Sequence, residues 1–136
     1  MVEMMNNQIR AFGLALLLTF TTWAVSCANA GELTAPTQVV NEYLSSLVNG
    51  DTQKLVQLIG GRMKQNNRQL ILSPDSYSQF LKKNYAGVQT TIEEIVPDGT
   101  RVRARVRFDY PSQDSSLIEF HLTENNGLWK ITDEVY

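Results

Sequence analysis

The sequence predicts an α+β domain in which helices come first and four antiparallel strands follow, with a cleavable leader in front. Three observations support this fold class. Apolar residues recur at helical spacing up to Gly87, they alternate with polar residues after it, and residues 1–30 form an apolar segment of their own. Helices followed by a run of strands are typical of α+β domains. A chain of 136 residues is long enough for one such domain.

Residues 1–30 have the pattern of a secretory signal peptide. An uncharged apolar run covers residues 11–25, and the small side chains of Ala28 and Ala30 match a signal-peptidase site. A helix of that length is about 22 Å long, whereas a bilayer core is roughly 30 Å thick, so a membrane span is the poorer interpretation. Cleavage after Ala30 leaves residues 31–136 as a single domain, which we expect to be periplasmic or secreted.

Cys27 is the only cysteine of the chain and offers an alternative localisation. The stretch from Trp23 to Cys27 resembles a bacterial lipobox, although Ala24 stands where such boxes usually carry Leu. Lipidation of Cys27 would anchor the protein in the cell envelope, and only in that case do we expect membrane contact. In both cases the folded domain holds no thiol, so no disulfide is predicted.

The predicted helices cover residues 36–49, 51–60 and 73–87, each with an apolar stripe at helical spacing. Pro36 suits the first turn of the first helix, and Gly50 suits its C-terminal cap. The polar stretch 62–69 is predicted to be a loop.

The predicted strands cover residues 88–96, 101–110, 117–123 and 128–135, where polar and apolar residues alternate. Pro97-Asp98-Gly99 and Asn126-Gly127 mark turns between them. On the first strand we expect Ile92 and Val96 to face inward and Glu93 to face outward.

The order of these parts resembles the nuclear-transport-factor-2-like superfamily, also called cystatin-like. The resemblance rests on the Asn49-Gly50-Asp51 junction, on Tyr85-Ala86-Gly87 at the end of the last helix, and on residues 127–131 (GLWKI) near the end of the meander. It covers residues 35–136 and is closest to small exported members that are uncharacterised. It implies a curved four-stranded sheet with the helices packed in its concave face, as a cone with a hollow interior. The superfamily includes isomerases, hydrolases and binding modules, so it does not choose a function.

A row of cations is predicted on the outer face of the sheet, because the second strand alternates arginines with apolar residues. Glu93, Asp109 and Glu119 share this face. One interpretation is a solvated ladder of opposite charges. The other leaves two arginines unpaired, as a docking surface for an acidic partner. The predicted interaction face consists of Arg101, Arg103, Arg105, Arg107 and Lys130.

Aromatic and apolar side chains are predicted to line the inner face. They form either a filled core or a pocket for a small apolar or amphipathic ligand, whose polar end the tyrosines would orient. The predicted lining consists of Tyr43, Phe80, Tyr85, Phe108, Tyr110, Phe120 and Trp129.

Catalytic and metal-binding residues are not evident in the sequence. The single histidine, His121, is predicted on the outer face, away from any cleft. The acidic pairs Glu93-Glu94 and Asp133-Glu134 are expected to split between opposite faces, with Asp133 turned inward near the rim. We therefore predict no catalytic residue, no metal site and no cofactor. A net charge of −2 argues against general nucleic-acid binding.

The sequence thus favours an exported, non-catalytic binding or accessory domain of the bacterial envelope. Its partner is predicted to be an unidentified envelope protein that docks on the sheet face. The alternatives are a carrier of a small ligand and a small hydrolase or isomerase.

Overall fold

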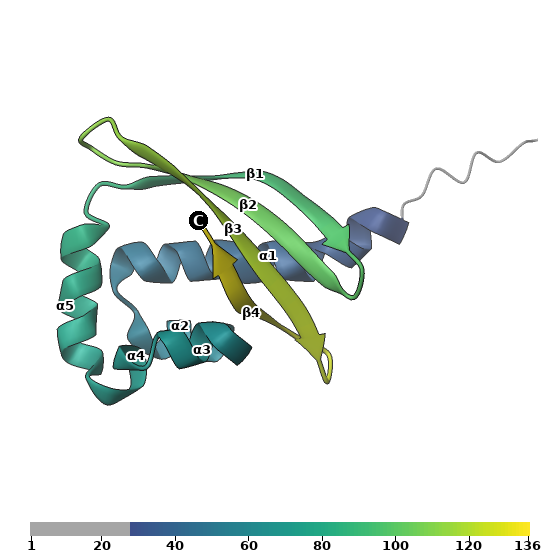
Figure 1. The fold of residues 1–136 in the computed structure, drawn as a ribbon, viewed down its shortest axis with the longest axis horizontal. Helices are drawn as coiled ribbons and strands as arrows, with labels where there is room; N and C mark the ends of the chain where they lie inside the picture. The colour runs from purple at the N-terminus through teal and green to yellow at the C-terminus, as the bar shows by residue number, and fades with distance from the viewer. Residues whose placement is uncertain (1–27) are drawn as a thin grey trace, which may run out of the picture.

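The computed structural model describes residues 28–136, so Cys27 and most of the predicted signal peptide lie outside the described residues. The order of elements in the described part is the predicted one, helices and then strands (Figure 1). The helices are α1 (Ala28–Asn49), α2 (Thr52–Leu58), α3 (Gly61–Asn66), α4 (Gln69–Leu72) and α5 (Pro74–Asn84). The strands are β1 (Gln89–Asp98), β2 (Arg101–Asp109), β3 (Ser115–Asn125) and β4 (Leu128–Val135).

The strands form one antiparallel sheet in the order β1-β2-β3-β4. The sheet curves past α1, which contacts β1, β2 and β4, and α5 stands across the C-terminal end of α1 (Figure 1). This arrangement confirms the predicted α+β class and the curved four-stranded sheet with helices in its concave face. None of the helices within residues 28–136 is both long enough and apolar enough to cross a membrane.

The core lies between α1 and the inner face of the sheet. Along β2 the apolar residues are buried and the arginines between them lie toward solvent, and β3 shows the same alternation. The prediction for these two strands is therefore confirmed. The core side chains of α1 and the sheet are Val40, Tyr43, Leu44, Leu47, Val102, Ala104, Val106, Phe108, Ile118, Phe120, Leu122 and Ile131.

Two helical predictions are wrong. The stretch 62–69, predicted as a loop, forms α3 and the start of α4, because the buried Met63 anchors an otherwise polar segment. One apolar residue has no period, so the pattern gave no helical signal. The first helix also begins at Ala28, which places Pro36 in its interior. Pro36 is buried and Leu33 packs on the core, and this burial offsets the hydrogen bond that proline lacks.

A β-bulge in β1 changes which side chains face inward. The register runs Ile92↔Val106 and then Glu94↔Arg105, so Glu93 is the extra residue. After the bulge Ile95 lies opposite the buried Ala104, and Val96 lies opposite Arg103. The prediction that Val96 faces inward is therefore wrong. Glu93 and Glu94 were expected on opposite faces, yet both carboxylates contact arginines of β2.

A second register shift, between β3 and β4, has the same effect near the C-terminus. Leu122 pairs with Ile131 but His121 pairs with Asp133, so Thr132 is the extra residue. Asp133 therefore lies on the outer face, where its carboxylate is 3.1 Å from Arg62. The expectation that Asp133 turns inward is wrong. Its neighbour Glu134 takes the inward position instead.

Candidate functional site

Glu134 is the carboxylate that the β4 shift turns to the inner face. It lies opposite Phe120 and is half-buried. Burial raises the pKa of the Glu134 carboxyl group, a hydrogen bond with Tyr136 opposes this, and the nearby Asp133 charge raises it further. The balance is a pKa above that of an exposed glutamate.

Four tyrosines interact electrostatically with Glu134, and the fifth, Tyr110, interacts with Tyr85 and Tyr136, so all the tyrosines of the chain belong to one group. They come from α1, from α5 and the residue after it, and from the segments that follow β2 and β4. We call Glu134 and these residues the tyrosine cluster. Its tyrosines are Tyr43, Tyr77, Tyr85, Tyr110 and Tyr136.

The phenol groups of the cluster interact electrostatically with Glu134 and with one another. Burial, and after it the Glu134 charge, raises the pKa of Tyr43 well above its usual range and also raises that of Tyr77. Burial raises the pKa of Tyr85 to about 12, with further contributions from Tyr110, Tyr136 and Glu134. These hydroxyls are therefore protonated at neutral pH. The Tyr77 hydroxyl already donates to Oδ1 of Asn67 at 3.2 Å, and those of Tyr43 and Tyr85 can donate hydrogen bonds within the cluster.

Aromatic rings fill the space beneath the cluster. The ring of Tyr43 meets Phe120 edge-on with centroids 5.4 Å apart, and Phe120 meets Phe108 at 6.5 Å. The ring of Tyr85 packs on Phe108 at 6.1 Å. These are favourable distances for aromatic pairs. The four rings pack on one another here, as in a filled core, so a ligand of the cluster must sit on these rings.

Each arginine of β2 has a carboxylate within 4 Å, so the structure agrees with the charge-ladder interpretation and not with two unpaired arginines. Five acidic residues pair with these four arginines, which leaves little net positive charge for an acidic partner. The ion pairs are Arg101–Asp98 (3.5 Å), Arg103–Glu94 and Arg103–Glu119 (3.8 Å each), Arg105–Glu94 (3.8 Å), Arg107–Glu93 (2.8 Å) and Arg107–Asp109 (3.2 Å).

His121 and Lys130 lie near this ladder without extending it. Arg101 donates to Nδ1 of His121 at 3.3 Å, so Nε2 carries the proton and donates to Glu119 at 2.8 Å. Lys130 lies at the edge of β4, beside Gly60, whose N–H donates to the Ile131 carbonyl. Within residues 28–136, no three His, Cys, Asp or Glu side chains come together as a metal site.

Comparisons with known proteins agree on the fold. No protein-family model and no curated protein matches the chain. Among solved structures, NTF2-like proteins of unknown function match with 15–18% identity. The one from Silicibacter pomeroyi has a TM-score of 0.57 at 15% identity, covering 78% of this chain and 94% of that one. The one from Methylobacillus flagellatus has a TM-score of 0.56 at 18% identity, covering 79% and 91%. The chain has the NTF2-like fold.

Two predicted lining residues lie outside the interior of this NTF2-like domain. Phe80 is 53% exposed on α5, where it packs on Tyr77 with centroids 5.6 Å apart, so its assignment to the lining is wrong. The next residue, Leu81, takes the inward position of that turn. Trp129 is half-buried and lines an open groove of about 510 Å³ between α1, α2 and the β3–β4 turn. The groove also contains the ion pair between Lys54 and Glu42.

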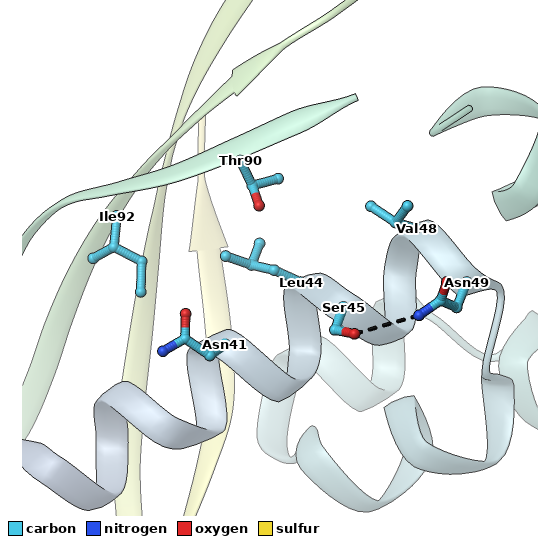
Figure 2. Close-up of a pocket in the computed structure, with 7 residues that line it drawn as sticks. All are labelled: Asn41, Leu44, Ser45, Val48, Asn49, Thr90 and Ile92. Carbon is cyan, nitrogen blue, oxygen red and sulfur yellow. Dashed lines mark hydrogen bonds between the residues drawn. The ribbon is translucent and has the colours of Figure 1, made fainter. Parts of the chain in front are cut away.

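A third feature of the NTF2-like domain is a groove between α1 and the free edge of the sheet at β1. Figure 2 shows Asn41, Ser45 and Asn49 along one side of α1, with Ile92 and Thr90 of β1 opposite. The volume of the groove is about 310 Å³. Asn49 already donates a hydrogen bond to Ser45 at 3.3 Å. The groove holds no charged group, so it is a weaker candidate site than the tyrosine cluster.

Sequence reasoning found part of the tyrosine cluster and missed its centre. Tyr43, Tyr85 and Tyr110 were predicted to lie at the inner face, and the structure brings them together. Glu134 was missed because an extra residue in β4 reverses the expected alternation. The sequence does contain one signal, the acidic pair Asp133-Glu134, since a strand without a bulge at the pair itself turns one member inward in either register.

Proposed function

We propose that the protein is an exported, non-catalytic binding domain that holds a small ligand at the tyrosine cluster. The observation that carries this proposal is the position of Glu134, a half-buried carboxylate on the inner face with tyrosine hydroxyls around it. A few polar groups set among aromatic rings are typical of ligand sites. The hydroxyls and Glu134 would orient the polar end of a ligand, and the rings would contact its apolar part.

Proton-transfer catalysis is a second candidate, and the same carboxylate favours it. A carboxyl group whose pKa is raised by burial suits a general base, and the tyrosine hydroxyls could stabilise a developing oxyanion. The packing beneath the cluster supports binding over catalysis. Phe108 and Phe120 are each 1% exposed and fill the place where an enclosed substrate would sit.

Docking of an acidic protein on the sheet face is less well supported. The arginines of β2 already have carboxylate partners, and a new partner would have to compete with them. Export rests on the signal-peptide pattern of residues 1–30, and lipidation of Cys27 stays the alternative for the mature N-terminus. Mass spectrometry of the protein from its envelope fraction distinguishes a chain that begins at Gly31 from a lipidated one.

The test of the binding proposal is a fragment screen of the purified protein by two-dimensional NMR, with small amphipathic compounds. We expect hits to shift the backbone resonances of Glu134, Tyr85 and Tyr110. Replacing Tyr110 by Ala should weaken the binding of these compounds, because Tyr110 is half-buried and contributes a ring and a hydroxyl. The matched control is Leu117→Ala, an exposed apolar residue on the opposite face of the sheet. Hits that map to the groove at β1, or to the arginines, would refute the assignment of the site.

A further inference from the structure

Glu134 differs from the other half-buried carboxylates in lacking a cationic partner. Among the described side chains five other carboxylates are half-buried, and each has an Arg or Lys within 4 Å. Within residues 28–136, Glu134 forms no ion pair, and the side chain that hydrogen-bonds to its carboxylate is the neutral Tyr136. The five paired carboxylates are Glu42 (Lys54, 2.9 Å), Glu94 (Arg103 and Arg105, 3.8 Å), Asp109 (Arg107, 3.2 Å), Glu119 (Arg103, 3.8 Å) and Asp133 (Arg62, 3.1 Å).

The surroundings of Glu134 also favour a positive charge. Removing a carboxylate from water is costly unless a counter-charge compensates for it. Glu134 lies opposite Phe120 in the sheet, and the rings of Tyr43 and Tyr85 pack on Phe120 and Phe108. The faces of such aromatic rings carry negative electrostatic potential and attract cations. Asp133, the next residue, lies on the outer face, where Arg62 is 3.1 Å away. The unpaired Glu134 carboxylate and the ring faces therefore both attract a cation and repel an anion.

We infer that the ligand of the tyrosine cluster is a small organic cation, an alkylated or primary ammonium compound. Its nitrogen would lie beside Glu134, opposite Phe120 in the sheet, and its carbon substituents would contact the rings of Tyr85, Tyr110 and Tyr136. This inference rests on the proposed function, since it names the ligand class of the same site. It goes beyond that proposal by committing to a charge.

Other occupants fit the geometry less well. A metal ion needs several ligands, and the described residues provide no group of three candidate side chains. A neutral ligand would leave the Glu134 charge uncompensated. An anion would face the unpaired charge of Glu134. A compact ammonium ion satisfies the carboxylate and the rings with one charge.

The test compares three probes of nearly the same shape and different charge. Choline is the cation. Dimethylbutanol carries a tert-butyl group in place of trimethylammonium and is neutral. Dimethylbutanoate keeps the tert-butyl group and carries a carboxylate at the end where choline has its hydroxyl group, so it is the anionic probe. Each probe is titrated into the purified protein, and the resonances of Glu134 and the five tyrosines are followed by NMR. We expect choline to bind about tenfold more tightly than dimethylbutanol, and dimethylbutanoate to bind least.

Two pairs of variants locate the effect. Glu134→Gln keeps the size of the side chain and removes the charge, so it should abolish the preference for choline. Asp133→Asn is the matched control, because it removes the same charge from the adjacent residue on the outer face. Tyr85→Phe should keep choline binding, since a cation contacts the ring, whereas Tyr85→Leu should weaken it several-fold.

The outcomes separate this inference from the proposed function. Equal binding of choline and dimethylbutanol at the cluster, or a preference that persists in Glu134→Gln, overturns the cation and leaves the binding site intact. If none of the three probes shifts the cluster while amphipathic fragments bind elsewhere, both the ligand class and the site are wrong. Preference for choline that disappears in Glu134→Gln, and not in Asp133→Asn, supports both.

Discussion

Replacing Phe120 by Ala tests whether the interior beneath the tyrosine cluster is filled. The ring is 1% exposed and contacts Tyr43 and Phe108 with centroids 5.4 and 6.5 Å away. Truncation of a buried Phe to Ala costs about 3–5 kcal/mol. Each aromatic contact is worth about 0.5–1.5 kcal/mol beyond the buried area. Because two such contacts are lost, we expect a loss near the upper end, about 4–5 kcal/mol.

The assay is urea unfolding followed by far-ultraviolet circular dichroism. With a denaturant slope of about 1–2 kcal/mol per molar urea for a small domain, the midpoint should fall by roughly 2–5 M. A domain of this size is typically stable by about 5–15 kcal/mol, so Phe120→Ala could be largely unfolded. Phe120→Leu therefore serves as a second variant, with an expected loss of about 1–1.5 kcal/mol.

The control is Leu117→Ala on the same strand. Leu117 is 47% exposed on the opposite face, and its loss should change the stability by about 0.5 kcal/mol or less. If Phe120→Ala cost no more than this control, the ring would not be packed on both sides. The argument for a filled interior, and with it for a ligand held above the rings, would then fail.

Three further predictions concern the carboxylate, the bulge and a helix junction. Because burial raises the pKa of Glu134 above its unfolded value, the folded state loses stability as pH rises from the unfolded pKa through the folded one. The stability of Glu134→Gln relative to wild type should therefore increase as pH rises through that interval, as measured by thermal melts at a series of pH values. A difference in stability that does not change with pH would contradict this. Deletion of Glu93 should be tolerated, because Glu93 is the extra residue of the bulge. We expect the free energy of unfolding, measured in urea, to fall by about 1 kcal/mol through loss of the ion pair with Arg107. Loss of the fold on this deletion would refute the register. Gly50→Ala should cost more than about 3 kcal/mol in the same assay, because its φ is +67° and a Cβ would lie 2.7 Å from the Ser78 carbonyl oxygen. Gly99→Ala, with a φ of +63° and nothing within 4 Å, should cost only about 1–2 kcal/mol; equal losses would show that strain alone matters at Gly50.

Features written in short stretches of the chain could be predicted from the sequence. The alternation in β2 places its apolar side chains inward and its arginines outward, and the structure confirms it. The Asn126-Gly127 turn has positive φ at both residues, as its composition indicates. The end of the first helix at Gly50 is confirmed in the same way. Each of these depends on the local backbone alone.

Features that depend on pairing or packing with distant parts of the chain were decided only by the tertiary structure. Met63 makes α3 a helix because its side chain enters the core. On α5, Leu81 faces inward and Phe80 outward, although both fit the apolar stripe. The packing of α5 against its neighbours determines which of the two side chains is buried.

The candidate site shows the same division most clearly. The sequence supplies the five tyrosines and the Asp133-Glu134 pair, and regular alternation along a strand would turn one acidic residue of the pair inward. Which of the two does so depends on the hydrogen bonds between β3 and β4, where one extra residue shifts the register. Strand side chains alternate with a period of two, so a single extra residue reverses every later position. No local pattern marks that residue, and only the partner strand determines that Glu134 faces the tyrosines.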